Sequence, residues 1–397
     1  MLDSARPRPV GLLGPLARLA RIDLGGPLVV VVVVFALLIG VRLSESGGDP
    51  TGLVVFGKNF AAYTHPPRGA IISDGDGYDG QFFWLQSTDP LLLHDATVAG
   101  FARANARFRT QRVAYPAVAF ALGAGQHDAI LWTLIAINLA AVVALTYGFA
   151  RFARSRGWSG WWALAIALLP GLELATLRDL SDTLAVATMF GGLLAWRLGR
   201  RWCAAGLLAV AALTREPMVL AALAVAIEMA IKGWHGRHVR GEVGRIRRQG
   251  WPVVAVPAAA FFAWQAYIDL RFGTNAAASS SYVFPLKSFF DEIHQSFAHA
   301  SPLAGAWELC FLALIALGLA ASVALWRSSV SAVSIAAVLF GLSLLPLTFG
   351  DFWSYTRLSA PMFAALLLAG LEQGNRFALT VCATAAALTL FIPAMIG

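Results

Sequence analysis

Charged residues are scarce in this chain. Only 13% of its 397 residues are Asp, Glu, Lys or Arg, whereas a soluble domain usually carries about a quarter. The chain is instead 58% hydrophobic, with a mean hydropathy of +0.68, and its apolar residues come in long runs. Because each membrane-spanning helix needs roughly 20 apolar residues, these runs predict an integral membrane protein.

Cysteines and nucleotide-binding motifs are also few or absent. The three cysteines, Cys203, Cys310 and Cys382, lie in apolar stretches away from any histidine cluster. They therefore fit neither a disulfide framework nor a zinc site. The sequence contains no P-loop, no glycine-rich nucleotide fingerprint and no evident internal repeat. The net charge is +8, but the basic residues are not interleaved with aromatic residues as they are in proteins that bind nucleic acids. We therefore expect no nucleic-acid partner.

The apolar runs predict an all-α integral membrane protein with about eleven transmembrane helices in a single domain, 1–397. Two neighbouring runs are short and meet at Thr214-Arg215-Glu216-Pro217, which predicts a loop or a broken helix packed against other protein. The expected spans cover about 27–43, 129–150, 158–172, 180–198, 204–213, 217–231, 252–269, 304–326, 330–347, 358–371 and 377–395.

Basic residues predict the orientation of these helices. Most Lys and Arg residues fall at the N-terminus and in alternate loops, above all in the basic loop 232–250. The positive-inside rule places those segments in the cytoplasm. The large polar segment 44–128 then lies outside the cell's inner (plasma) membrane. Within it, 90–109 and 113–123 are amphipathic, which predicts helices lying at the membrane interface.

The outer segment contains the run Ser73-Asp74-Gly75-Asp76-Gly77-Tyr78-Asp79-Gly80-Gln81. Glycine beside Asp79 allows the backbone to approach a ligand closely, and a carboxylate held there can take a proton from an acceptor hydroxyl. Asp74 and Asp76 are spaced as Asp-x-Asp and can instead bind a divalent cation, Mg²⁺ or Mn²⁺, together with phosphate oxygens. The alternative interpretation is an Asp-rich turn that only redirects the chain.

Further ionisable and polar residues lie near the predicted outer ends of the spans. Such residues are costly at membrane depth and are therefore functional candidates. Arginines among them can bind phosphate bidentately; alternatively, Arg178 pairs structurally with Asp179 or Asp182, and Arg215 with Glu216. We expect one site formed from Tyr78, Asp79, Gln81, Arg109, Arg112, Arg178, Asp179, Asp182, Arg215, Glu216, Asp351, Tyr355 and Arg357.

The order of these features resembles the GT-C glycosyltransferases: a cytoplasmic N-terminus, one span, a large outer segment with an early Asp, then many spans. Local stretches similar to this superfamily are Leu177-Arg178-Asp179-Leu180-Ser181-Asp182, Ala205-Gly206-Leu207-Leu208 with the following Leu213-Thr214-Arg215-Glu216-Pro217, Gly77-Tyr78-Asp79-Gly80-Gln81-Phe82-Phe83, and Gln111-Arg112-Val113-Ala114-Tyr115-Pro116.

That resemblance implies an inverting enzyme. It would move a sugar from a polyprenyl-phosphate donor to a glycan, lipid or protein acceptor, with Asp79 as the general base and arginines or a metal holding the leaving phosphate. Asp74 and Asp76 stay open as alternatives to Asp79. Two other functions are weighed: a transporter or flippase of a lipid-linked or polar substrate, and a non-catalytic partner in an envelope complex. A transporter needs polar residues in mid-span, and the spans here are apolar.

Overall fold

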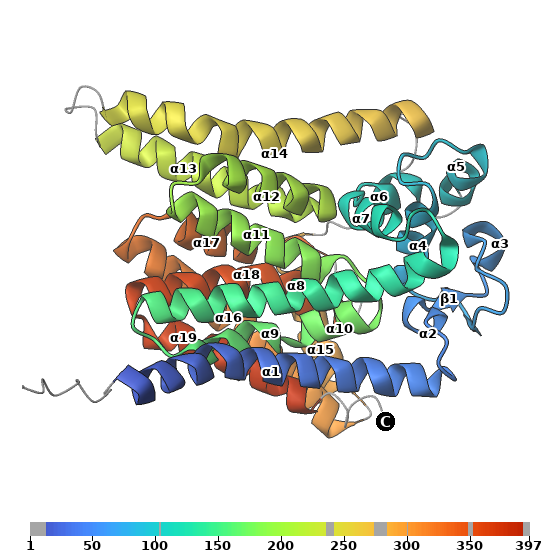
Figure 1. The fold of residues 1–397 in the computed structure, drawn as a ribbon, viewed down its shortest axis with the longest axis horizontal. Coiled ribbons are helices and arrows are strands. Elements are labelled where there is room, and N and C mark those ends of the chain that lie inside the picture. Colours follow the sequence, from blue (N-terminus) through green and yellow to red (C-terminus); the bar gives the residue numbers. More distant parts are fainter. Residues whose placement is uncertain are drawn as a thin grey trace, which may run out of the picture.

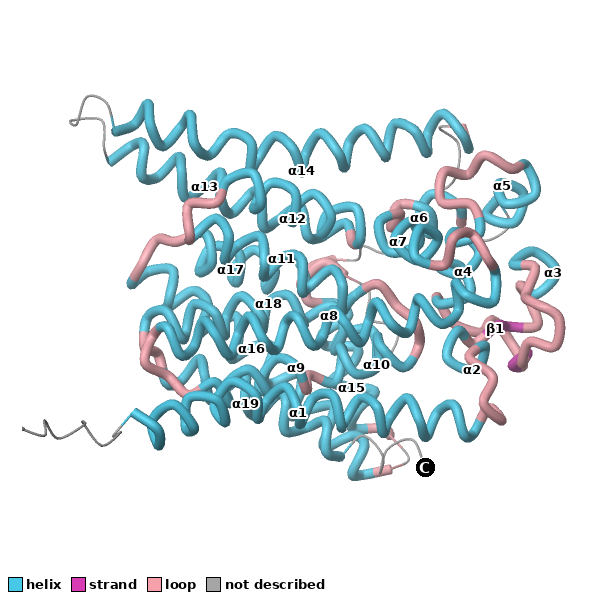
Figure 2. The backbone as a smooth tube through the Cα atoms, viewed as in Figure 1, coloured by secondary structure: helices cyan, strands magenta, loops and turns pink. Residues whose placement is uncertain are grey.

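The computed structural model describes residues 13–102, 105–235, 242–273, 284–299, 301–347 and 352–391. These residues form a helical bundle whose long helices run side by side, with most of the connecting loops at its two ends (Figures 1 and 2). The described residues contain one small sheet, in which β1 (Phe56–Gly57) pairs in parallel with β2 (Ile72–Ser73). The all-α architecture predicted from the sequence is therefore confirmed.

Five described helical stretches are long enough and apolar enough to cross a membrane, which indicates a membrane-embedded protein. They lie in α1 (Leu13–Glu45), α8 (His127–Ser155), η2 (Glu216–Met218) together with α13 (Val219–His235), α14 (Glu242–Phe272) and α16 (Pro302–Ser328). A sixth would be a bent pair, in which η1 (Gly160–Ala163) and α9 (Leu164–Ala167) meet α10 (Pro170–Leu177) at 62°.

The bend has a local cause. Pro170 is the first residue of α10, where its missing N–H costs nothing. A proline also disfavours the helical conformation at the residue before it, and Leu169 is extended, with φ −67° and ψ 133°.

Each of the eleven predicted spans overlaps a helix, but only the six above meet the criterion of length and apolarity. A count of eleven crossings therefore stays a prediction. The remaining predicted spans correspond to α11 (Asp182–Arg197), α12 (Arg201–Thr214), α17 (Ala332–Leu344), α18 (Phe352–Gln373), and α19 (Arg376–Ala387) with η4 (Leu388–Phe391).

The core of the bundle is centred on α18. From Tyr355 to Leu371 almost every side chain of this helix is buried. A helix that is apolar on all sides belongs in an interior, and α18 packs against α10, α16, α17 and α19. The short helix α15 (Lys287–Phe297) packs against α16. The interior position of α18 matters for function because its first turns carry Arg357.

Residues 46–102 and 105–126 gather at one end of the bundle, here called the loop end (right in Figure 1). Their apolar core includes Phe56, Phe83, Trp84 and Tyr115. The amphipathic stretch predicted at 113–123 is confirmed as a helix, and the one at 90–109 contains two. The helices of the loop end are α2 (Thr51–Val54), α3 (Ala61–Thr64), α4 (Gly80–Thr88), α5 (Asp95–Ala102), α6 (Ala106–Thr110) and α7 (Ala114–Leu122).

The opposite end carries the ion pairs of the predicted cytoplasmic segments. Glu372 at the end of α18 pairs with Arg197 of α11 and lies 3.5 Å from Arg156, which follows α8. Glu228 of α13 pairs with Lys232 at 2.5 Å. The residues assigned to one side of the membrane therefore meet at one end of the fold, while the side that this end faces stays a prediction.

Candidate functional site at the loop end

Asp79 is positioned by the glycine that follows it. A Cβ atom on Gly80 would lie 2.6 Å from the carbonyl oxygens of both Val54 and Arg178, so only glycine allows this approach. Asp79 directly precedes α4, and its carboxylate pairs with Arg109 and lies 3.8 Å from Arg112. About a quarter of the Asp79 side chain is exposed, so the group is reachable from outside the fold.

The other members of the Asp/Gly run take different positions. Asp74 and Asp76 are exposed, and Asp76 accepts a hydrogen bond from Asn59 at 2.7 Å. Gln81 is buried and bonds only to backbone groups, those of Gly57, Asp76 and Tyr78. The Gln81 side chain therefore stabilises the backbone conformation of the Asp/Gly run. Among the described residues no group of three or more His, Cys, Asp or Glu side chains could hold a metal, and metal binding by Asp74 and Asp76 stays a prediction.

A second carboxylate lies deeper. Asp182 opens α11, is 2% exposed, and pairs with Arg215 at 2.5 Å and with Arg357 at 3.6 Å. Arg215 follows the last residue of α12, and Arg357 lies on α18. The predicted loop at 214–217 is confirmed: α12 ends at Thr214, and a single 3₁₀ turn, η2 (Glu216–Met218), separates it from α13.

Arg112 links the two carboxylate positions. Its Nε donates to Oε1 of Glu216 at 2.9 Å, and its other end reaches Asp79. Glu216 is the neighbour of Arg215 in the chain. Together with the ion pairs of Asp182, these contacts bring together five separate parts of the sequence. We call the joined residues the arginine–carboxylate cluster: Asp79, Arg109, Arg112, Asp182, Arg215, Glu216 and Arg357.

The cluster is richer in positive than in negative charge, because four arginines meet three carboxylates. Burial, followed by the neighbouring charges of Arg112 and Arg357, lowers the pKa of Arg109 to about 10. At neutral pH Arg109 is still charged. A net positive cluster of partly buried guanidinium groups favours binding of an anion.

Tyr78 connects the cluster to one further arginine. The guanidinium of Arg357 lies 5.5 Å from the centre of the Tyr78 ring, and that of Arg178 lies 5.7 Å from it. Both are within cation–π range. Arg178 forms no ion pair with any described carboxylate, so its predicted structural pairing with Asp179 or Asp182 is not found in this part of the chain. Likewise Arg215 pairs with Asp182, while the ion pair of Glu216 is with Arg112.

Asp179 takes no part in the cluster's ion pairs. It is fully buried, has a left-handed backbone with φ +48°, and neither of its carboxylate oxygens has a hydrogen-bond partner in the described structure. Burial raises the pKa of Asp179 well above its ordinary range, which favours the neutral acid. Of the other predicted site residues, Tyr355 is fully buried in α18, and Asp351 lies outside the described residues.

Residues on α14 that the sequence analysis did not predict hold segment 91–112 in place. We call this segment the arginine-bearing segment because it contains Arg109 and Arg112. On α14, the Trp264 indole N–H donates to the Thr110 carbonyl at 3.0 Å, and Arg271 donates to the Leu92 carbonyl at 2.6 Å. The Tyr267 hydroxyl donates to Leu91 at 2.5 Å. Their spacing of three, four and seven residues puts them on one face of a helix. This polar face on an otherwise apolar span was the feature of the sequence that could have predicted these contacts.

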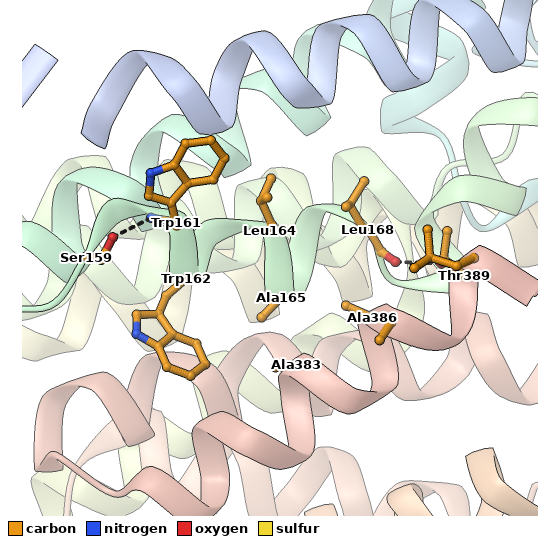
Figure 3. Close-up of a pocket in the computed structure, with 11 residues that line it drawn as sticks. Ser159, Trp161, Trp162, Leu164, Ala165, Leu168, Ala383, Ala386 and Thr389 are labelled. Carbon is orange, nitrogen blue, oxygen red and sulfur yellow. Dashed lines mark hydrogen bonds between the residues drawn. The ribbon is translucent and has the colours of Figure 1, made fainter. Parts of the chain in front are cut away.

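An apolar cavity of about 360 Å³ lies elsewhere in the bundle, between the broken span and α19 (Figure 3). Trp161, Trp162 and Ala386 are among its lining residues, and Thr389 donates across it to the Leu168 carbonyl at 2.6 Å. None of the cluster residues lines it. It offers no charged group to a polar substrate.

Comparison with known protein families, with curated proteins and with solved structures finds no match to this chain. The resemblance to GT-C glycosyltransferases therefore stays a hypothesis, and the function is argued from the geometry of the cluster.

Proposed function

We propose that this protein is a membrane glycosyltransferase that moves a sugar from a polyprenyl-phosphate donor to a glycan, lipid or protein acceptor. The observation that carries the proposal is the contact of Asp79 with Arg109 and Arg112, within a net positive cluster at one end of an apolar bundle. In this proposal the loop end faces outward from the inner (plasma) membrane, and the N-terminus lies in the cytoplasm, as the distribution of basic residues favours.

The chemistry is a single inverting displacement. Asp79 takes the proton from the acceptor hydroxyl, and the acceptor oxygen forms a bond to the anomeric carbon. The bond from that carbon to the phosphate oxygen breaks, and the polyprenyl phosphate leaves with the electron pair. The positive cluster supports this step because arginines stabilise the charge on a leaving phosphate. A divalent cation held by Asp74 and Asp76 would supply the same stabilisation.

Ion pairing sets a condition on the base. A carboxylate beside a guanidinium group gives up basicity, because the positive charge favours its ionised form. Asp79 contacts both Arg109 and Arg112. In this mechanism the donor phosphate competes with Asp79 for Arg109, and its binding frees the carboxylate to take the acceptor proton. Such coupling would limit proton removal in the absence of donor.

The test is a transfer assay with the full chain in detergent or in proteoliposomes. Polyprenyl-phosphate-linked radiolabelled sugars are supplied as donors and bacterial envelope extracts as acceptors, and release of polyprenyl phosphate is measured. Asp79→Asn should lower the rate by about 100-fold or more, the usual contribution of a general base. Asp95→Asn is the control, at an exposed position of the same outer segment, and should keep the rate of the unaltered protein.

Two results would reject the proposal or part of it. An Asp79→Asn variant with the unaltered rate would reject Asp79 as the base. If the unaltered protein consumes no donor but moves intact lipid-linked sugar across the proteoliposome membrane, the protein is a transporter and the glycosyltransferase proposal is wrong.

A further inference from the structure

Arg178 differs from the other arginines predicted to bind phosphate. Arg112, Arg215 and Arg357 each pair with a carboxylate of the cluster. Arg178 contacts the Tyr78 ring but pairs with no described carboxylate. Its positive charge is therefore the one in this set that a bound anion can neutralise without displacing an existing ion pair.

A second arginine, Arg42 at the end of the first span, lies near Arg178, because their chain neighbours Leu43 and Leu177 pack against the same apolar cluster. Burial, followed by the like charge of Arg42, lowers the pKa of Arg178, and the Glu45 carboxylate acts in the opposite direction. Arg42 pairs with Glu45 at 3.0 Å and donates to the Gly52 carbonyl at 3.3 Å. Two arginines and one carboxylate thus leave a net positive charge at this place.

A cavity lies beside Arg42 and Glu45, which are among its lining residues, whereas Arg178 is not. It has a volume of about 180 Å³ and is lined by Arg42, Glu45, Ser46, Thr51, Gly52, Val55, Ile71 and Ser73. That is below the roughly 300–1,000 Å³ of pockets for drug-sized ligands. Its small size fits a compact headgroup better than a whole glycan. The ring of Tyr78, between Arg178 and Arg357, connects this place to the arginine–carboxylate cluster.

We propose that Arg178 and Arg42 form a phosphate-binding site at the mouth of the cavity between the end of α1, α2 and β2. The inference rests on the proposed function and deepens it, because it adds this pair to the cluster arginines as a contact for the donor phosphate. Arginine suits the task, since its planar fork binds two phosphate oxygens at once. The phosphate belongs to a lipid headgroup or is free in solution, and the two sources are separated by experiment.

Binding is measured on the full chain in detergent, without turnover, as the shift in thermal unfolding midpoint at constant ionic strength. The probes are farnesyl phosphate, farnesol and inorganic phosphate. Farnesyl phosphate should stabilise the protein and farnesol should not. Arg178→Gln and Arg42→Gln should each weaken farnesyl phosphate binding about 10-fold or more, the effect of losing one charge-assisted contact. Stabilisation by inorganic phosphate at similar concentrations would show a free-phosphate site.

Controls separate a lost contact from a damaged fold. Arg68→Gln removes an exposed arginine of the same segment and should leave binding unchanged. Arg178→Lys keeps the charge and should retain weakened binding. Equal affinities for farnesyl phosphate in Arg178→Gln, Arg42→Gln and Arg68→Gln would overturn the inference, as would equal stabilisation by farnesol.

The two proposals can fail separately. If binding of farnesyl phosphate depends on Arg178 and Arg42 but the protein transfers no sugar, the phosphate-binding site stands and the glycosyltransferase proposal is rejected. If the protein transfers sugar but its affinity for farnesyl phosphate does not depend on Arg178 or Arg42, the glycosyltransferase proposal stands and the phosphate-binding site is rejected.

Discussion

The Nε atom of Arg112 lies 2.9 Å from Oε1 of Glu216, although the two residues are 104 positions apart in the chain. This hydrogen bond fastens the loop end to the break between α12 and α13. Glu216 is available there because the helix is interrupted: Arg215 is extended, with φ −156° and ψ 129°, and Pro217 lies in the following 3₁₀ turn. The interruption turns two adjacent charged side chains toward different partners.

Removing the Asp182 carboxylate should destabilise the fold strongly. Asp182→Asn leaves Arg215 and Arg357, both less than a tenth exposed, without their carboxylate. Breaking a buried ion pair by removing one partner costs about 3–5 kcal/mol. Thermal unfolding in detergent measures the effect. Asp128→Asn changes an exposed carboxylate in the first turn of α8 and is the control, and equal unfolding midpoints for the two variants would contradict the prediction.

Two glycine substitutions should have opposite effects. Gly80→Ala would place a methyl group 2.6 Å from two carbonyl oxygens, so the contact between the Asp79 turn and Arg178 must open. We expect lower stability and loss of sugar transfer. Gly206→Ala, inside α12, meets nothing within 4 Å and should stabilise the helix by about 0.5–1 kcal/mol. Unfolding midpoints and transfer rates test both, and an active, stable Gly80→Ala variant would disprove the need for glycine there.

Trp264 should act as a positioning residue for the arginine-bearing segment. Trp264→Phe keeps an aromatic ring and removes the hydrogen bond to Thr110, the neighbour of Arg109. We expect a lower turnover number with a small change in unfolding midpoint, because one hydrogen bond contributes only about 0.5–1.5 kcal/mol. Trp251→Phe, at an exposed position on the same helix, should change neither quantity. A fall in midpoint without any fall in turnover would show a purely structural role.

The stability contributed by Asp89 should depend on pH. Burial raises the pKa of this carboxyl, but hydrogen bonds from the backbone N–H groups of His94 and Leu93, joined by the His94 side chain 3.2 Å away, outweigh it, so the pKa is lowered. A lowered pKa in the folded state gives stability that is present above the unfolded value, about 3.9, and is lost as pH falls through the folded value. Asp89→Asn should therefore destabilise at pH 7, by about 1–3 kcal/mol.

The test of Asp89 is the difference in unfolding midpoint between the variant and the unaltered protein, followed from pH 7 downward. The difference should shrink only below about pH 4. Asp95→Asn, an exposed residue of the same segment, should show no such trend. A difference between unaltered protein and Asp89→Asn that stays constant down to pH 3 would contradict the assignment.

Much of the architecture was predictable from one-dimensional patterns. Long apolar runs predict helices because a bilayer offers the backbone no hydrogen-bond partners, and a helix is found in every predicted span. The break at 214–217 was predictable because Pro217 removes a backbone donor and two charged residues interrupt the apolar run. The short amphipathic helix predicted at 113–123 was found at 114–122. These features depend on residues close together in the sequence.

The sequence alone also determined that acids and arginines gather on one side of the protein, since alternating spans return the chain to the same face. Only the tertiary structure decided which of them pair. Asp182 pairs with Arg215 and Arg357, while Asp179, three residues earlier, is buried and has no hydrogen-bond partner among the residues that the structure describes. An ion pair depends on atoms within a few ångströms, and that distance follows from how helices pack, which no local pattern records.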